Sequence, residues 1–146
     1  MIIIDKGNIF DSGCMALVNP VNCVGIAGKG LALEFKKRYP ENYREYVEAC
    51  EAGALKLGGY PYMYTGPDAC IFNFPTKNHW RDISYLHYIG ISLTRLRWQI
   101  IEYNISSIAI PALGCGEGGL WWPDVKQQME VALFDLPAYI RVYAPH

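Results

Sequence analysis

Residues 73–81 bring together several side chains that could do chemistry, at the end of a strand-like run: Lys77, Asn78, His79, Trp80 and Arg81. A lysine can attack a sugar aldehyde as a neutral amine, or stabilise charge on a leaving group as an ammonium. An aromatic ring flanked by cations suits a nucleobase and its phosphates. Each residue alone could equally be a surface or packing residue, so the segment is a candidate site only as a group.

Two glycine-rich segments, residues 22–30 and 111–119, each follow another strand-like run. Glycine lets a ligand approach the backbone, and a helix that starts after such a loop offers free N–H groups to an anion. Because ligands of α/β sheets bind beyond the carboxyl ends of strands, the two loops together predict a diphosphate clamp. Neither loop has the spacing of a dinucleotide or triphosphate motif, and Leu31 stands where Ser or Thr would hold Mg²⁺. A nucleotide triphosphatase is therefore disfavoured.

The elements that must position these loops alternate between strands and helices. Leu86, Ile89, Leu93, Leu96 and Ile100 follow helical spacing within residues 83–103. Helices are also predicted after residue 30, through 43–50 and through 125–133, with Pro40 as a stop signal and Pro123 as a start signal. Strands are predicted at 2–5, 16–22, 60–65, 70–74, 107–111 and 139–143. The alternation predicts a three-layer α/β/α fold with a central mixed sheet of about six strands, as a single domain over residues 1–146.

Composition narrows the classes of function. The 13 Lys and Arg residues and 14 Asp and Glu residues give a net charge of −1, so any contact with DNA must be local. No apolar run approaches the roughly 20 residues of a membrane span, and the first residues do not resemble a signal peptide. We therefore expect a cytoplasmic location and no membrane partner. Five cysteines without metal-ligand spacing predict reduced thiols, no metal site and no cofactor.

Four strings of sequence resemble the macrodomain family, whose members bind ADP-ribose between two such loops. They are Lys-Gly-Asn-Ile-Phe at 6–10, Val-Asn-Pro-Val-Asn-Cys-Val-Gly at 18–25, Gly-Lys-Gly-Leu-Ala at 28–32 and Ile-Pro-Ala-Leu-Gly-Cys-Gly at 110–116. Residues 28–43 and 73–81 are similar to the DarG-type branch, antitoxin enzymes that remove ADP-ribose from thymine in DNA. The resemblance implies the macrodomain fold and a glycosidic-bond hydrolase. Its implied partners are ADP-ribose, ADP-ribosylated DNA with a single-stranded or flipped base, and a toxin as a further candidate.

The same resemblance implies the roles of individual residues. Lys77 is the expected catalytic residue, with Asn22 as a second catalytic candidate. Adenine is expected at Asn8 and Ile9; because the family usually has Asp at the first of these, an uncharged amide predicts weaker adenine binding. The ribose and phosphates are expected at Asn22, Val24, Gly25, Ile26, Gly28, Lys29, Gly30, Thr76, Leu113, Gly114, Cys115, Gly116, Glu117, Gly118 and Gly119, and the DNA base at His79, Trp80 and Arg81.

Two other functions stay open at this level. Relatives that hydrolyse ADP-ribose esters pair the lysine with an Asp in the second loop, where this chain has glycines and Glu117 is the nearby carboxylate. A hydrolase of protein esters or of O-acetyl-ADP-ribose is thus one alternative, and a non-catalytic ADP-ribose reader is the other. Of Trp121 and Trp122, one is expected in the core and the other in the cleft. Cys23 and Cys115 are expected to be packing residues.

Overall fold

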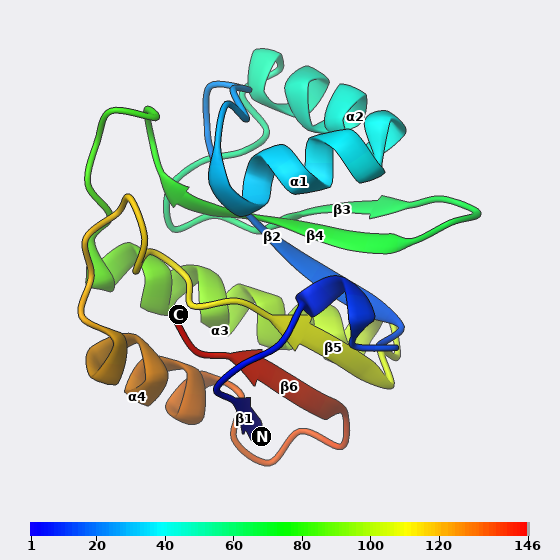
Figure 1. Ribbon diagram of the computed structural model, residues 1–146, viewed down its shortest axis with the longest axis vertical. Helices are drawn as coiled ribbons and strands as arrows, with labels where there is room; N and C mark the ends of the chain where they lie inside the picture. The colour runs from blue at the N-terminus through cyan, green and yellow to red at the C-terminus, as the bar shows by residue number, and fades with distance from the viewer. Residues whose placement is uncertain (146) are drawn as a thin grey trace.

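The computed structural model describes residues 1–145 and arranges them around one six-stranded sheet (Figure 1). The strands are β1 (Ile2–Ile4), β2 (Ala16–Asn22), β3 (Tyr62–Thr65), β4 (Cys70–Lys77), β5 (Ser107–Ile110) and β6 (Tyr139–Tyr143). Their order is β1-β6-β5-β2-β4-β3, and neighbours are parallel except for the antiparallel pair β3 and β4. The predicted mixed sheet is confirmed; the end of the predicted domain, His146, lies outside the described residues.

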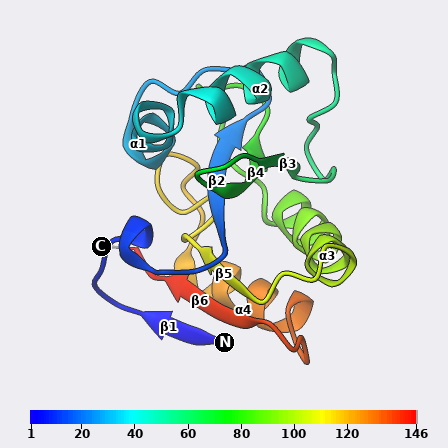
Figure 2. The ribbon, with the colours of Figure 1, turned by 90° about the vertical axis from the view of Figure 1, so that its right-hand side faces the viewer.

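Four α-helices cover the two faces of the sheet. They are α1 (Gly30–Arg38), α2 (Pro40–Glu51), α3 (Leu86–Glu102) and α4 (Trp122–Ala132), and a short 3₁₀ helix, η1 (Ile9–Asp11), precedes β2. Helices α1 and α2 lie on one face and α3 and α4 on the other, so the predicted three layers are present (Figures 1 and 2). Within residues 1–145, no helix has the length and apolar character needed to cross a bilayer.

Three boundaries differ from the sequence prediction, and the first of them matters for the site. Strand β4 continues to Lys77, where the pattern predicted an end at residue 74, because Pro75 and Lys77 keep pairing with β2. Lys77 is therefore held at a strand end rather than in a loop. Helix α1 ends before Pro40, as predicted, but Pro40 also begins α2, and only Tyr39 separates the two helices. A proline is tolerated at the first helical position because the N–H that it lacks would be unpaired there anyway. Helix α3 begins at Leu86, three residues later than predicted.

Apolar clusters fill the spaces on both sides of the sheet. The larger cluster packs α3 and α4 against the sheet through residues such as Phe72, Phe74 and Met129. On the opposite face Phe35 of α1 packs against Ile71. The first seven residues of β4 are all buried, as expected of a strand covered on both faces. Burial on both sides fixes the position of β4 and hence of the residues at its end.

A polar network crosses this apolar interior at Asn73 of β4. Its Nδ2 donates to Oδ1 of Asn42 at 2.8 Å and to the Tyr62 carbonyl at 3.1 Å. Its Oδ1 accepts from Nδ2 of Asn19 at 3.0 Å and from Nδ2 of Asn42 at 3.2 Å. The three asparagines are buried. Because buried amides are costly without partners, Asn73 ties β2, β3 and α2 to one register.

Replacing Asn73 with alanine is therefore expected to lower the free energy of unfolding by about 2–4 kcal/mol, since two buried amides lose their partner. Urea unfolding measures the change. The matched control is Val131→Ala on the exposed surface of α4, which is expected to stay within about 0.5 kcal/mol of wild type. Equal stabilities of the two variants would show that the network carries no such energy.

Candidate functional site

The main cleft opens where the central strands β2 and β5 separate. These strands pair over only two residues, at Ala16 and Leu17 of β2. Pro20 on β2 and Pro111 after β5 have no N–H to donate to a ladder, and both line a cavity of about 1130 Å³. Parallel strands that part at their carboxyl ends leave a crevice at that edge of the sheet, which is where α/β folds bind ligands. The topology of the sheet thus creates the site.

Asn22, the last residue of β2, organises the first glycine loop. Its Oδ1 accepts the Val24 N–H at 3.1 Å and the Ile26 N–H at 3.4 Å, and its Nδ2 donates to the Ile26 carbonyl at 2.8 Å. The Tyr46 hydroxyl lies 2.8 Å from both Asn22 Oδ1 and the backbone carbonyl oxygen of Asn22, which share its proton. Gly25 adopts a φ of +82° within this turn. The amide therefore shapes the loop; its catalytic role stays a prediction.

Helix α1 starts directly after this loop and points its first turn at the cleft. Lys29 is the N-cap and makes no side-chain cap, so the first N–H groups keep their capacity to bind an anion. Gly28, Gly30 and Leu31 line the cavity beside them. Because the first residues of α1 line the cavity, the positive end of the helix dipole faces it. This end of α1 suits a phosphate group.

The segment that precedes α3 supports the second glycine loop through a backbone hydrogen bond. The Ser84 N–H donates to the Gly118 carbonyl at 2.9 Å, and the Leu120 N–H donates to the Gly114 carbonyl at 2.9 Å. A Cβ on Gly118 would meet the Ser84 hydroxyl and would lie 2.6 Å from the Gly114 carbonyl oxygen. Gly114 itself has a φ of +76°. The loop keeps this path only with glycine at these two positions.

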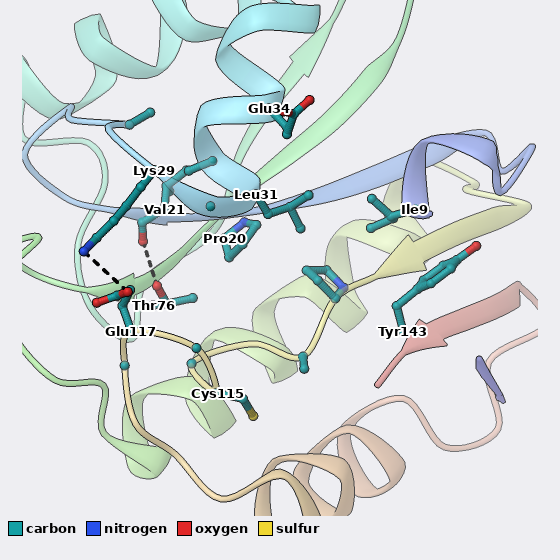
Figure 3. A pocket seen from close by; sticks show the side chains of 18 of the residues that line it. Ile9, Pro20, Val21, Lys29, Leu31, Glu34, Thr76, Cys115, Glu117 and Tyr143 are labelled. Atoms are coloured by element: carbon teal, nitrogen blue, oxygen red, sulfur yellow. Dashed lines mark hydrogen bonds and ion pairs between the residues drawn. The ribbon is translucent and has the colours of Figure 1, made fainter. Parts of the chain in front are cut away.

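An ion pair joins the two loops across the mouth of the cleft. Lys29 Nζ lies 3.4 Å from Glu117 Oε1, and both side chains are exposed (Figure 3). Exposed pairs contribute little to stability, so this contact matters chiefly for where the two loops meet. Glu117 lines the cavity, and its observed partner is Lys29 rather than Lys77.

The other end of the cleft is apolar. Ile9 and Tyr143 extend towards it from η1 and from the end of β6 (Figure 3). Asn8 lies beside them and caps η1, since its Oδ1 accepts the Phe10 N–H at 3.0 Å. The oxygen keeps a second lone pair, so the predicted bond to adenine remains compatible with this cap. An aromatic ring beside an aliphatic side chain suits the flat face of a base.

Lys77 and Trp80 form the end of the cleft nearest β4. Lys77 Nζ donates to the Trp80 carbonyl at 2.9 Å. The neighbouring Thr76 hydroxyl donates to the Val21 carbonyl at 3.1 Å and is buried (Figure 3). The His79 ring centroid lies 5.2 Å from that of Trp80, and the Arg81 guanidinium lies 4.5 Å from the Trp80 ring. A lysine amine, an indole and a guanidinium group thus stand together at the rim.

Most of the predicted site residues line this one cavity. Those from the ADP-ribose prediction that do so are Asn8, Ile9, Asn22, Ile26, Gly28, Lys29, Gly30, Thr76, Gly114, Cys115, Gly116, Glu117 and Gly118, together with Lys77 and Trp80. His79 and Arg81 flank Trp80 outside the lining, and their contact with DNA stays a prediction.

Four predicted ligand residues are not brought to the cavity. Gly25 packs against α2, where its carbonyl accepts the Tyr43 hydroxyl at 2.9 Å, and the exposed Val24 precedes it in the same turn. Leu113 is fully buried in the larger core cluster. Gly119 follows the lining residues 114–118 without joining them. The prediction treated each loop as lining the cavity along its whole length, whereas the ends of the loops turn towards α2, the core or solvent.

Several lining residues were not predicted. Leu31, Glu34 and Arg38 share one face of α1, a spacing from which they could have been found. Tyr143 ends a parallel strand, a position that also points to this edge of the sheet. The remaining unpredicted lining residues are Gly7, Phe10, Pro20, Val21, Ala27, Ala32, Pro111, Ala112, Ala144 and Pro145.

The cysteines near the loops do not supply a nucleophile, and Trp121 and Trp122 do not line the cleft. Burial raises the pKa of the Cys23 thiol to about 12 and that of the Cys115 thiol to about 11, so both stay protonated at neutral pH, as expected of packing residues. Trp122 packs partly buried against the core. Trp121 is exposed and lies outside the cavity lining, so its predicted place in the cleft is wrong. Among residues 1–145, no three His, Cys, Asp or Glu side chains gather as a metal site.

The comparison with protein families agrees with this geometry. The Macro domain model matches residues 18–129. A protein named DNA ADP-ribosyl glycohydrolase from Thermus aquaticus is 46% identical over 96% of this chain and 40% of its own length. The protein of that name from Mycobacterium tuberculosis is 45% identical over 99% of this chain and 42% of its own length. A DNA ADP-ribosyl transferase and glycohydrolase fusion protein from Thermosipho africanus is 35% identical over 96% of the chain.

Solved structures give the same picture. The macrodomain of Thermus aquaticus DarG superposes with a TM-score of 0.92 at 46% identity and covers 99% of both chains. The structure of Thermosipho africanus DarTG in complex with ADP-ribose superposes with a TM-score of 0.89 at 34% identity, over 96% of this chain and 40% of that one. The present chain spans about two fifths of the length of the curated relatives that it matches.

A pair of alanine substitutions tests the packing of the second loop. Gly118→Ala is expected to lower the free energy of unfolding by about 1–3 kcal/mol, because its methyl group collides with Ser84 and with a backbone oxygen. Gly116→Ala adds the same group to the same loop where nothing lies within 4 Å, and should change stability by less than about 0.5 kcal/mol. Thermal and urea unfolding measure both, and indistinguishable variants would refute the close packing.

Proposed function

The chain belongs to the Macro domain family, and on that premise we propose that it is an ADP-ribosyl hydrolase that removes ADP-ribose from a base in DNA, thymine in particular. The observation that carries the proposal is the position of Lys77, which stands with Trp80 at one end of a cleft built by two glycine loops. Identity of 45–46% along nearly the whole chain to proteins named DNA ADP-ribosyl glycohydrolase supports it.

The cleft has the order of groups that ADP-ribose requires. The apolar end at Ile9 and Tyr143 takes the adenine, and the loops with the uncapped start of α1 take the diphosphate. This orientation brings the second ribose to Lys77 and the attached base to the exposed indole of Trp80 at the rim. The phosphates of the DNA outside the cleft can then pair with a few cations near the rim, which is compatible with a net charge of −1 for the whole chain.

Hydrolysis breaks the bond between C1″ of the ribose and a nitrogen of the base. The oxygen of water ends on C1″, and its proton ends on the departing base. Lys77 can assist in two chemically distinct ways: its ammonium can stabilise the negative charge that develops on the base, or its free amine can attack C1″ of the opened sugar. Borohydride reduction separates the two, because only the second gives an adduct that is trapped on Lys77.

Removal of ADP-ribose from DNA would oppose an enzyme that adds it. The Thermosipho africanus relative, which carries a transferase and a glycohydrolase in its name, supports a functional pairing of this kind. We therefore include in the proposal that this chain acts as an antitoxin towards a DNA ADP-ribosyl transferase. Its action needs only the modified DNA, which is the product of the transferase and the substrate of the hydrolase, and no contact between the two proteins.

Substitution of Lys77 by alanine is expected to lower kcat for an ADP-ribosylated thymidine oligonucleotide by at least about 100-fold, the usual effect of removing an essential catalytic group. Release of ADP-ribose, followed by chromatography, measures it. Lys37→Ala removes an exposed cation of α1 that does not line the cleft, and should retain wild-type activity.

The same assay with ADP-ribosylated glutamate and with O-acetyl-ADP-ribose tests the substrate. Turnover of these esters without turnover of the modified DNA would replace the proposal with an ester hydrolase. Binding of ADP-ribose without turnover of any linkage would replace it with a reader.

A further inference from the structure

Beside the cleft lies a row of exposed aromatic side chains, of which the proposed reaction uses only Trp80 at the rim. We propose that this row is a binding track for the single strand of DNA next to the modified base. The aromatic row consists of Trp80, Tyr85, Tyr88 and Tyr60, and it runs from the rim of the cleft along the first half of α3. The inference rests on the proposed function, since it needs a base of DNA at Lys77.

The exposure of these rings is the first observation. Trp80 is 41% exposed, Tyr85 53%, Tyr88 38% and Tyr60 49%. Tyr85 and Tyr88 are neighbours, with ring centroids 6.3 Å apart and an edge-to-face angle of 85°. Several large rings open to solvent on one surface mark a recognition site more often than chance exposure does. Exposed aromatic rings are also the side chains on which unpaired bases stack.

The members of the row follow one another from the rim of the cleft, through the start of α3, to the segment that precedes β3. Trp80 lines the cavity, and Tyr85 follows five residues later, so their Cα atoms lie at most about 17 Å apart. Tyr88 is one helical turn further on. A Cβ on Gly58 would lie 3.1 Å from the Tyr88 ring, so the segment between α2 and β3 packs beside it. Figure 2 shows this segment running next to α3.

Arg95 joins Tyr60 to the same surface. Its Nε donates to the Gly58 carbonyl at 3.0 Å, and its guanidinium lies 4.8 Å from the centroid of the Tyr60 ring. The start of the row has the same arrangement, because the Arg81 guanidinium lies 4.5 Å from the Trp80 ring. Each end of the row thus pairs an aromatic face with a cation, and the exposed Lys56 adds a third positive charge nearby.

This combination fits a single strand better than a duplex or a protein. Unpaired bases stack on aromatic faces while the phosphates between them pair with scattered cations, without reading sequence. The nearby carboxylate of Asp82 accepts the His79 N–H at 3.0 Å and so belongs to the turn below Trp80. A base seated at Lys77 must have its neighbours on the strand just outside the rim, and the row begins there.

The test compares two substrates that share the bond to be cleaved. One is ADP-ribosylated thymidine nucleoside, and the other is a single-stranded oligonucleotide of about ten nucleotides with the modified thymidine at its centre. In the double variant Tyr85→Ala, Tyr88→Ala, kcat/KM for the oligonucleotide is expected to fall at least about fivefold, through KM, because two stacking surfaces are lost. The value for the nucleoside is expected to stay unchanged.

Tyr139→Ala is the matched control, since Tyr139 has the same exposure as Tyr60 but begins β6, at the edge of the sheet opposite the cleft. Its values for both substrates should equal those of wild type. Arg95→Gln should raise KM for the oligonucleotide but not for the nucleoside, and should also reduce the salt dependence of the oligonucleotide KM.

Four outcomes overturn the inference. If wild type has the same kcat/KM for the nucleoside as for the oligonucleotide, the neighbouring strand adds no binding and there is no track. A double variant with the wild-type oligonucleotide KM excludes this row as the track, and an equal loss on both substrates shows a structural effect instead. Wild type that cleaves neither substrate refutes the proposed function, and the track with it.

Discussion

The early separation of β2 and β5 is the constraint on which the cleft depends. After two paired residues the strands diverge, and Pro20 and Pro111 leave no N–H groups there that a ladder could use. The other backbone groups of the diverging segments need partners. They find them in turns closed by the Asn22 amide and by the Ser84 N–H. The same divergence therefore opens the cavity and requires the two loops that line it.

Both loops are supported by residues from the opposite layers of the fold. Tyr46 of α2 holds Asn22 from one side, and the segment before α3 holds Gly118 from the other. The buried Asn73 network fixes β4 between these layers, and β4 ends at Lys77. Lys77, at a strand end between two supported loops, is positioned before any ligand arrives, and such preorganisation lowers the cost of binding.

The sequence predicted the alternation of elements, the two loops and the place of Lys77 and Trp80 beside them, because each depends on local pattern. It could not predict which loop residues face inward. Gly25 turns away because Tyr43, eighteen residues later, binds its carbonyl, and Leu113 turns into the core. Tyr143 enters the cleft only because β6 lies beside β5 in the sheet. The extension of β4 past Pro75 likewise depends on pairing with β2. The residues around Pro75 do not by themselves predict that pairing.

We propose that the cleft binds ADP-ribose and presents its second ribose to Lys77, so that binding and catalysis use different residues. Calorimetric titration of ADP-ribose into wild type and into the Lys77→Ala variant tests it most directly. One binding site is expected in each protein, with dissociation constants within about threefold of one another, a difference below ~0.7 kcal/mol. Absence of binding to wild type, or loss of binding when Lys77 is replaced in a folded protein, would contradict it.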